Sequence, residues 1–552
     1  MSIDEPSTPA RASELTLRPS SRLRIDLPDA EERSGVLNLV VAFAAAAVGF
    51  VVVGGGSLDL GPAEAKLGLS AVEPLGPFGQ SLGGWEPGVW VGSVLPSRAW
   101  ATVGGMWDAA IVRWPGAIAG IVVGLFLARA MKAALGVRAA CLATLCWFGG
   151  VALVDRSADA GVDLIAGLGT ILALNRLLTR GSGWVAGGLA SWAFLAGGWP
   201  PLAVIGLAAL VLGRAGASIS YKTVVPVAVT VAGWSAWALA TTRAQVWAAA
   251  MSLPLTQGSA WSMAVGVLGL GFPWSPFALL GIAPRVRDGW ATTGRPFAVG
   301  WGQVALACLV VGTVVPGLAT AARMPALAGL AIVAAASWDS ILAGSLSDAT
   351  ASRRWLHGLS FAVVALWAAG MLVWGGRLAL AVGYYRPVAI LLIALAVGAA
   401  TLTLVAAWSG DCRGTLGAIV LVAISLKLAH WGHHVPEWNY RHGQGPWGRA
   451  IGQWVPRKRT VYVLHGWPSD LIFAAERPFR ALADPRLLPD RPGPSPKFIL
   501  LQQSEFDHWL DKWPKILPVA RFQDEWGGGR VLARTEGPFS WREAAIADRL
   551  SD

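Results

Sequence analysis

The stretch Pro387-Val-Ala-Ile-Leu-Leu-Ile-Ala-Leu-Ala-Val-Gly-Ala-Ala-Thr-Leu-Thr-Leu-Val-Ala-Ala-Trp408 contains no charged side chain. A helix of this length is about 33 Å long at about 1.5 Å per residue, which matches the roughly 30 Å hydrocarbon core of a bilayer. The stretch therefore predicts a membrane-spanning helix.

Similar apolar runs recur on both sides of this stretch, and several approach the roughly 20 residues that a membrane span needs. They fall at 36–55, 111–131, 137–154, 161–179, 184–197, 200–214, 222–241, 263–284, 301–322, 325–345, 357–375, 387–408 and 414–431. Two of them, 184–197 and 200–214, are short, so they predict either a re-entrant pair or two tilted spans. The pattern indicates an α-helical polytopic membrane protein with about 13 transmembrane helices.

The composition supports this class. Of the 552 residues, 54% are hydrophobic and 14% are charged, whereas a soluble globular protein carries about 25% charge. An ordinary soluble enzyme, a disordered chain and a fibrous protein are therefore excluded. The four cysteines lie in or beside apolar runs, which is typical neither of a disulfide framework nor of a metal site.

The charged residues are concentrated in the tail. Residues 431–552 hold 31 of the 77 Asp, Glu, Lys and Arg residues, 17 of them basic and 14 acidic. The net charge of +11 comes mostly from basic residues in loops between apolar runs. An orientation with the N-terminus inside and the tail outside places most of these cations on the inner side, as the positive-inside rule expects. No nucleic-acid partner is predicted.

This distribution predicts three parts. Residues 1–35 form a disordered cytoplasmic arm, 36–431 a transmembrane domain with a large outer loop at 56–110, and 432–552 a soluble extracytoplasmic α/β domain. The loop is rich in Gly, Pro and Trp and is expected to lie on the membrane surface. In the tail, strand-like runs (460–464, 497–502 and 529–534) alternate with helical patterns (446–455, 469–476 and 504–512).

Two carboxylates, Asp59 and Glu64, follow the first apolar run on the predicted outer side. A partly desolvated carboxylate near the bilayer binds a proton more readily and can act as a general base. The alternative is a solvated loop that caps a short helix beginning near Pro62. These residues alone leave both interpretations open.

A second acidic group, Asp155, Asp159 and Asp163, lies in the next outer loop at a spacing of four residues. On a helix these side chains share one face, where ionising all three is unfavourable unless a cation binds. Arg156 is the local partner. A helix cap with a surface ion pair explains the same residues.

Other residues have two interpretations each. Arg113 opens the second run and would either hold a lipid phosphate or reach the interface with its long side chain. Asp339 is either an intramembrane functional acid or one that reaches the inner interface. His430, His433 and His434 would bind a metal or belong to an ordinary interfacial segment.

The order of these features is typical of one membrane-protein family. In chain order, they are the acidic patch after the first run, Arg113-Trp-Pro115, Asp155-Arg-Ser-Ala-Asp-Ala-Gly-Val-Asp163, Trp184-Val-Ala-Gly-Gly-Leu-Ala-Ser-Trp-Ala-Phe-Leu-Ala-Gly-Gly-Trp-Pro-Pro201, Gly271-Phe-Pro-Trp-Ser275, Pro436-Glu-Trp-Asn-Tyr440 and Thr460-Val-Tyr-Val-Leu464. From about residue 36 to 535 the chain resembles the bacterial GT-C membrane glycosyltransferases, in the branch of protein O-mannosyltransferases and lipid A aminoarabinose transferases.

The family's first acidic motif, Asp-Glu-Ala-Arg-Tyr, corresponds to Ala63-Glu-Ala-Lys-Leu67. Glu64 and Lys66 match the motif, and Ala63 replaces its first acid, for which Asp59 is the nearest substitute.

The family's second motif, Arg-x-Ala-x-x-Asp, matches at Arg156 and Ala158. Asp159 or Asp163 would take the place of its acid, because Gly161 stands at that position.

The resemblance implies transfer of a sugar from a polyprenyl-phosphate donor to a lipid, protein or glycan acceptor at the outer face of a bacterial inner membrane. The implied catalytic residues are Glu64, Asp59, Asp159 and Asp163, and the implied substrate-binding residues are Lys66, Arg113 and Arg156. No metal ligands are assigned, although a divalent cation is a possible cofactor. Membrane lipids are the other expected partners.

Two other classes of function are considered. The first is a non-catalytic GT-C-like protein that binds lipid-linked sugar or serves in an envelope complex, which Ala63 favours. The second is a transporter. Charged residues are sparse within the apolar runs, and paired inverted halves with matching broken helices are not evident, so the sequence disfavours transport.

Overall fold

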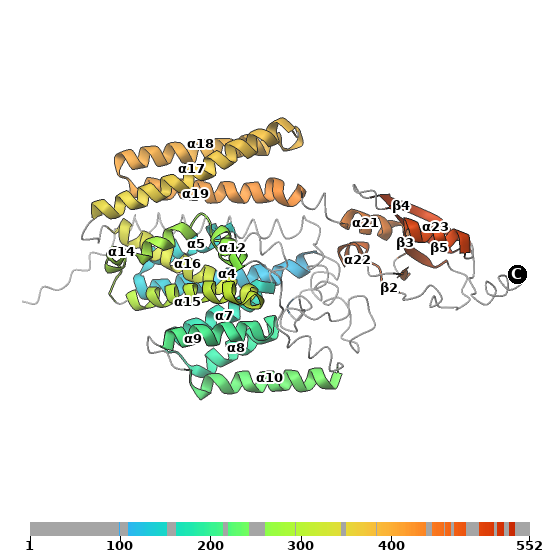
Figure 1. Ribbon diagram of the computed structural model, residues 1–552, viewed down its shortest axis with the longest axis horizontal. Coiled ribbons are helices and arrows are strands. Elements are labelled where there is room, and N and C mark those ends of the chain that lie inside the picture. The colour runs from blue at the N-terminus through green and yellow to red at the C-terminus, as the bar shows by residue number, and fades with distance from the viewer. Residues whose placement is uncertain are drawn as a thin grey trace, which may run out of the picture.

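A computed structural model shows a bundle of long helices with a small α/β domain beyond one end (Figure 1). The residues that the structure describes are Pro96, Ala99, 109–151, 162–213, 219–241, 260–292, 294–343, 349–381, 383–437, 444–456, 459–464, 469–481, 496–512, 516–523 and 529–535. The predicted arm, the run 36–55 and nearly all of the loop 56–110 lie outside these residues.

Each apolar run from residue 111 onward coincides with a helix, and the run 263–284 with a broken one. The helices are α4 (Ala109–Leu135), α5 (Val137–Gly149), α7 (Val162–Leu178), α8 (Gly183–Gly197), α9 (Trp199–Gly213), α10 (Tyr221–Thr241), α12 (Ala260–Leu270), α13 (Ser275–Ala278), α15 (Arg295–Val314), α16 (Ala319–Leu342), α17 (Ala349–Ala381), α18 (Arg386–Ser409) and α19 (Cys412–Ala429). Shorter elements connect them, namely η1 (Leu279–Ile282), α14 (Pro284–Asp288), η2 (Pro316–Leu318), η3 (Gly383–Tyr385) and the π-helical η4 (His430–His434).

The predicted class of α-helical polytopic membrane protein is confirmed. Among the described residues, six helices are long and apolar enough to cross a bilayer, and the bent pair Met263–Leu270 and Ser275–Ile282 adds a seventh if it forms one span. α5 and α9 are apolar but have only 13 and 15 residues, or about 20 and 22 Å. The number of about 13 spans therefore stays a prediction.

Helix α16 is the centre of the bundle and is buried along most of its length. It packs on α15 at Gly329, where a Cβ would overlap the carbonyl oxygen of Trp301 and the side chain of Ala305. α7 and α8 approach one another in the same way at Gly169. Small residues let helix backbones approach closely in membranes, which explains why glycine is spread through the apolar runs.

Helices α17, α18 and α19 form a layer on one side of the bundle (Figure 1). They pack mainly on one another, through a cluster of their own that includes Met371, Leu392 and Ala396. Their contacts with the rest of the bundle run through α5, α13 and α16.

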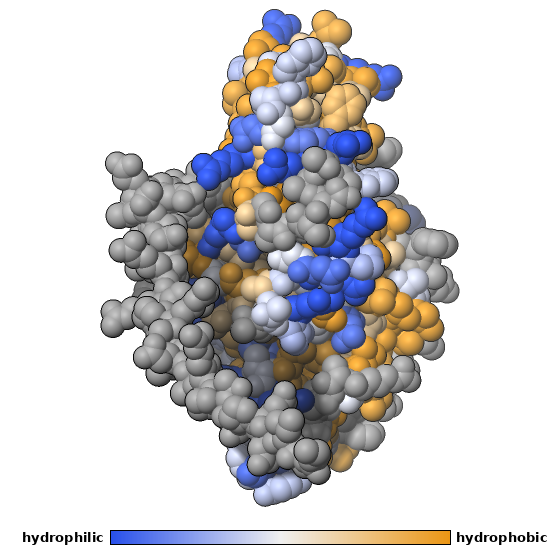
Figure 2. Space-filling view, turned by 90° about the vertical axis from the view of Figure 1, so that its left-hand side faces the viewer, coloured by the Kyte–Doolittle hydropathy of each residue, from blue (hydrophilic) through white to orange (hydrophobic). Residues whose placement is uncertain are grey.

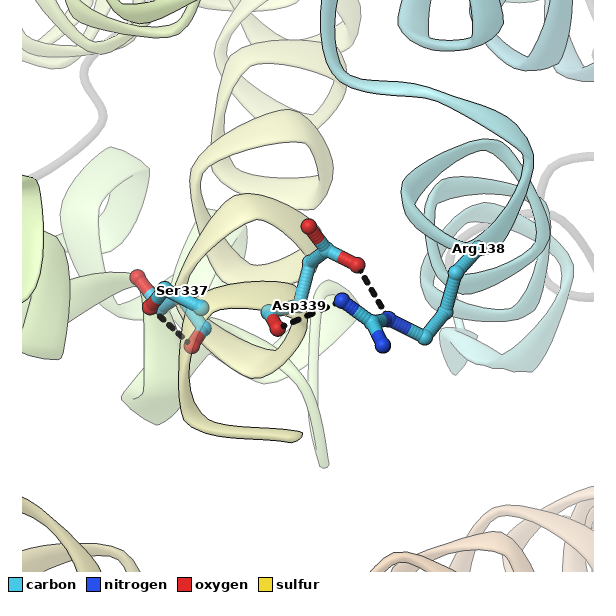
Figure 3. A network of polar contacts seen from close by, with 4 residues as sticks. Arg138, Ser337 and Asp339 are labelled. Carbon is cyan, nitrogen blue, oxygen red and sulfur yellow. Dashed lines mark hydrogen bonds and ion pairs between the residues drawn. The ribbon is translucent and has the colours of Figure 1, made fainter. Parts of the chain in front are cut away.

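The end of the bundle away from the α/β domain is polar. Arg138 at the start of α5 contacts Asp339 near the end of α16, with 2.6 Å between Nε and Oδ1, and donates a second bond to the Asp339 carbonyl oxygen (Figure 3). Asp339 therefore joins two helix ends at the polar boundary. Figure 2 shows hydrophilic side chains gathered across this end of the molecule.

The C-terminal α/β domain, residues 445–535, contains a mixed five-stranded sheet. Its elements are α21 (Gly445–Trp454), β1 (Val461–Val463), α22 (Ser469–Ala475), β2 (Phe479–Ala481), β3 (Phe498–Gln502), α23 (Gln503–Lys512), β4 (Ile516–Gln523) and β5 (Gly529–Thr535). The strand order is β2-β1-β3-β5-β4, with β1 parallel to β2 and β3, and β5 antiparallel to β3 and β4. The three strands and three helices predicted from the sequence are confirmed. The sequence analysis missed β2, which has three residues, and β4, an edge strand interrupted at Pro518.

The start of this domain is fixed by a buried carboxylate. Asp470 on α22 accepts a hydrogen bond of 2.8 Å from the backbone N–H of Gln444, which precedes α21. Arg530 on β5 donates to the Gln444 side chain and lies over the Trp447 ring, 5.3 Å from its centroid. These contacts tie the segment that leaves the bundle to both α22 and the sheet.

The domain also contacts the bundle through α4. Val112 in the first turns of α4 is fully buried in the apolar cluster that contains Ile451, Val455 and Phe473 of the domain. The beginning of α4 is thus part of the core of the α/β domain, and Arg113 follows directly.

Candidate functional site

The structure describes two of the seven predicted site residues, Arg113 and Asp163. The other five, Asp59, Glu64, Lys66, Arg156 and Asp159, lie outside the described residues. Whether the two predicted acidic groups meet therefore stays a prediction.

Arg113 and Asp163 lie at the same end of the bundle. They are in the first turns of α4 and α7, which pack on each other. The other ends of both helices meet the start of α15, where Gly294 touches Ala134 and Gly300 touches Leu178. The predicted cation and the predicted acid therefore share the end from which the α/β domain projects.

Arg113 is only 3% exposed. Its side chain is therefore enclosed by protein, next in sequence to Val112 of the domain cluster. This burial disfavours the interpretation in which Arg113 extends to the membrane interface. It fits the interpretation in which Arg113 binds an anion within the protein.

Asp163 forms an ion pair with Arg323, a residue that the sequence analysis did not single out as functional. Asp163 Oδ2 lies 3.7 Å from Arg323 Nη1, and the two side chains are 24% and 20% exposed. Arg323 belongs to the first turns of α16. The pair thus joins the two helices at the end of the bundle where both begin.

An apolar slot, partly open to the outside, begins directly beside this pair. Its walls come from α5, α7, the break between α12 and α13, and α16. The lining residues are Cys146, Trp147, Gly150, Leu164, Leu270, Gly271, Trp274, Ser275, Met324, Leu327, Leu330 and Ala331. Leu164 and Met324 immediately follow Asp163 and Arg323 in sequence, so the ion pair forms part of the rim of the slot.

One wall of the slot is the broken helix. The axis bends by 105° between Met263–Leu270 and Ser275–Ile282. The Ser275 hydroxyl donates a 2.6 Å hydrogen bond to the carbonyl of Leu268, which satisfies a backbone group freed by the break. Non-helical backbone at membrane depth is tolerated where it lines a cavity or is buried in protein, and the slot provides such a place.

A buried lysine on α19 contacts the end of α5. Lys427 on α19 is 6% exposed, and its ammonium group donates a hydrogen bond to the carbonyl of Phe148, near the end of α5. The sequence contained a signal for this residue, because Lys427 is the single charged side chain in the run 414–431. A charged residue within a span is a functional candidate by default.

The three histidines after α19 pack against aromatic rings. The His433 ring lies 4.7 Å from the ring centroids of both Trp374 and Tyr385. The Tyr385 hydroxyl donates to Glu437 at 3.2 Å. Among the residues that the structure describes, no three His, Cys, Asp or Glu side chains lie close enough to hold a metal ion. This arrangement fits the interfacial interpretation of the histidines.

No family model matches the sequence. No curated protein matches it either. Among the solved structures that share its fold are the crystal structures of ArnT from Cupriavidus metallidurans in the apo state and bound to undecaprenyl phosphate, with TM-scores of 0.68 and 0.69. In both comparisons the identity is 17%, and the match covers 90% of this chain and 98% of the ArnT chain. The fold expected from the resemblance to the GT-C transferases is thereby confirmed.

Proposed function

We propose that this chain is a membrane glycosyltransferase that moves a sugar from a polyprenyl-phosphate donor to a lipid, protein or glycan acceptor on the outer face of the membrane. The observation that carries the proposal is the apolar slot with the Asp163–Arg323 pair at its rim, in a fold shared with an ArnT structure bound to undecaprenyl phosphate. A donor of this class has the same two parts as the site, an apolar chain and a charged head.

In the proposed reaction, the bond between the anomeric carbon of the sugar and a phosphate oxygen breaks, and the acceptor oxygen bonds to that carbon. A carboxylate takes the proton of the acceptor hydroxyl. Asp163 is the candidate base that the structure describes, and Asp59, Glu64 and Asp159 are the candidates from the sequence. Because the slot and the rim would hold the donor in one place, part of the entropic barrier is removed on binding.

The departing polyprenyl phosphate carries the negative charge of the broken bond, so cations near the phosphate lower the barrier. Arg323 and Arg113 are the described candidates for this task, and Lys66 and Arg156 are those from the sequence. A planar guanidinium matches the spacing of phosphate oxygens, which favours arginine for this role. A divalent cation, for which no ligands are assigned, is a further prediction.

We place the protein in the inner, or plasma, membrane of a bacterium, with the N-terminal arm in the cytoplasm and the α/β domain outside. Cations near the far end of the bundle support this orientation, because Lys132 and Arg176 lie in the last turns of α4 and α7. The reaction would then occur on the side that the α/β domain faces, where this domain helps to select the acceptor.

The test is a transfer assay with the purified full-length protein in lipid nanodiscs and a polyprenyl-phosphate sugar as donor. Mass spectrometry of envelope glycans, with and without the protein, identifies the sugar and the acceptor beforehand. Asp163→Asn is expected to lower kcat by about 100- to 10,000-fold, the usual contribution of a general base. EDTA in the assay tests the divalent cation.

The matched control is Asp288→Asn, which removes a more exposed carboxylate that pairs with Arg295 on the far side of the bundle. This variant should keep wild-type activity. Equal activity of Asp163→Asn and the wild type would contradict the assigned role of Asp163.

The non-catalytic alternative makes a different prediction. If the protein only binds lipid-linked sugar, Glu64→Gln and Asp59→Asn together with Asp163→Asn leave the envelope glycans unchanged, whereas deletion of residues 444–552 abolishes the phenotype. Ala63, at the position of the family's first acid, is the observation that favours this alternative.

A further inference from the structure

A group of basic side chains surrounds the short helix α14, at the end of the bundle away from the α/β domain. α14 packs on η1 and α16, and its Val286 is buried. Asp288 at the end of α14 pairs with Arg295 at the start of α15, with 3.0 Å between Oδ1 and Nη2. Gly294, the residue before Arg295, touches Ala134 on α4. The end of α4 and the start of α5 therefore lie near α14.

These segments, together with the end of α16, carry more cations than acids. Their described residues include two acids, Asp288 and Asp339, and each of these pairs with one basic side chain. They include six basic residues, which we call the α14 basic patch: Arg129, Lys132, Arg138, Arg285, Arg287 and Arg295. All of them are exposed except Arg287, which is half-buried. Figure 2 faces this end of the molecule and shows the hydrophilic side chains gathered there.

Exposed apolar side chains lead up to the patch along α4. Ile118, Val122 and Leu125 are 43%, 39% and 62% exposed. Arg129 and Lys132 follow them at spacings of four and three residues. Residues at these spacings lie along one face of a helix. One exposed face of α4 is therefore apolar for about two turns and then basic where the helix ends.

The same change from apolar to basic occurs before α14. Leu279 and Ile282 in η1 are 56% and 69% exposed, and the exposed Arg285 follows three residues later. Exposed apolar surface that borders polar residues marks contact with a membrane or another partner. In a membrane-spanning bundle this surface faces the lipid chains, so the cations that follow it lie at the depth of the lipid headgroups.

This arrangement selects the chemistry of the partner. A lipid phosphate at this depth is within reach of guanidinium and ammonium groups, which attract its negative charge. The acyl chains of the same lipid would cover the exposed apolar side chains of α4 and η1. A soluble anion would meet the cations alone and leave the apolar surface uncovered. An anion that carries apolar chains therefore matches both parts of the surface.

We propose that the α14 basic patch binds the headgroup of an anionic phospholipid, whose acyl chains lie on the exposed apolar side chains of α4 and η1. In the proposed orientation this lipid belongs to the cytoplasmic leaflet. The patch and the slot lie at opposite ends of the bundle, so the inference does not depend on sugar transfer.

The experiment titrates the full-length protein in detergent micelles with phosphatidylglycerol, phosphatidylcholine or inorganic phosphate and measures binding by native mass spectrometry. The wild type is expected to bind phosphatidylglycerol at least about tenfold more tightly than phosphatidylcholine, whose headgroup has no net charge. Lys132→Gln combined with Arg285→Gln should weaken phosphatidylglycerol binding by about 25-fold, because each cation near the headgroups contributes about fivefold. Phosphatidylcholine binding should not change.

The controls separate this role from a general effect of charge or folding. Arg480→Gln combined with Arg534→Gln removes two exposed cations from the α/β domain and should bind phosphatidylglycerol like the wild type. Lys132→Arg combined with Arg285→Lys keeps both charges in the patch and should retain most of the affinity. If the double glutamine variant does not fold, each single glutamine variant should show a loss of about fivefold.

Three outcomes overturn the inference. In the first, the patch variants bind phosphatidylglycerol as tightly as the wild type. In the second, they lose phosphatidylglycerol and phosphatidylcholine equally, so the patch only supports the fold. In the third, inorganic phosphate binds as tightly as phosphatidylglycerol and displaces it, so the patch is a site for a soluble anion. Each of these outcomes leaves the transferase proposal unaffected, because that proposal is tested by the transfer assay.

Discussion

At the scale of single residues, three charged side chains in the described part of the bundle have defined neighbours. Asp163 faces Arg323, Asp339 faces Arg138, and Lys427 faces a backbone carbonyl. The ion pairs at the two ends of the bundle differ in the distance between their charged atoms. Arg138 and Asp339 make a short, direct hydrogen bond, whereas Asp163 and Arg323 are 3.7 Å apart, longer than a charge-assisted hydrogen bond. The looser pair is the one at the slot.

Asp470 in the α/β domain leads to a prediction about pH. Burial raises the pKa of its carboxyl above the usual value, although the N–H of Gln444 opposes this effect. Since the folded state holds this proton more tightly than the unfolded state, the contribution of Asp470 to stability is greatest at low pH. It falls as the pH rises from about 3.8, the unfolded value, through the raised folded pKa.

Asp470→Asn should remove this fall and keep an acceptor for Gln444. Hydrogen–deuterium exchange of α21 and α22 in the full-length protein, corrected for intrinsic rates at pH 4 and pH 7, measures the effect. Asp507→Asn, on the exposed face of α23, is the control and should retain the wild-type pH dependence. An Asp470→Asn protein whose α21 still loosens between the two pH values would refute the assignment.

At the scale of elements, two irregular helices create the slot. α5 is too short to cross the bilayer core, and the break between α12 and α13 bends the chain by 105°. Both irregularities meet at Gly150, where a Cβ would lie 3.2 Å from the Leu270 carbonyl oxygen. Two regular spans at these positions would pack along their full length and leave no slot between them.

The contact between α4 and the α/β domain is an element-scale prediction. Val112→Ala removes buried apolar surface from the domain core and should destabilise the docked domain by about 1–2 kcal/mol. Val137→Ala, at a 56% exposed position at the start of α5, is the matched control and should change stability little. Limited proteolysis between α19 and α21 reports docking. Equal cleavage rates for both variants would argue against a role of Val112 in docking.

At the scale of the whole molecule, the two ends of the bundle differ in the groups at their surface. One end has hydrophilic side chains across its middle (Figure 2), and the α/β domain projects from the other (Figure 1). The slot and its rim belong to the end with the domain. This polarity fits a protein that meets a membrane lipid and an acceptor on one side.

The proposed orientation is tested by labelling with a membrane-impermeant maleimide. The four native cysteines are free and are first replaced by alanine. Ser504→Cys, on the exposed surface of α23, should be labelled from the outside of intact spheroplasts. Arg413→Cys, at the opposite end, should be labelled only after the membrane is permeabilised. The reverse pattern would invert the topology and place the proposed reaction on the cytoplasmic side.

The sequence by itself determined the helices, the class of protein and most of the α/β domain. Apolar runs of about 20 residues have few other solutions in a bilayer, because every backbone group must be paired within the chain. The ends of α8, α9, α10 and α18 lie within a few residues of the predicted limits. β2 and β4 escaped detection because short strands and exposed edges carry little periodic signal.

Only the tertiary structure decided which side chains meet. Arg138 and Asp339 are 201 residues apart, and Lys427 and Phe148 are 279 apart, so no local pattern connects them. Arg323 stands between two predicted spans, and nothing in the local sequence connects it with Asp163 on α7. Hydropathy depends on each residue alone and sets the spans, whereas the slot and the ion pairs between helices depend on the packing of distant helices.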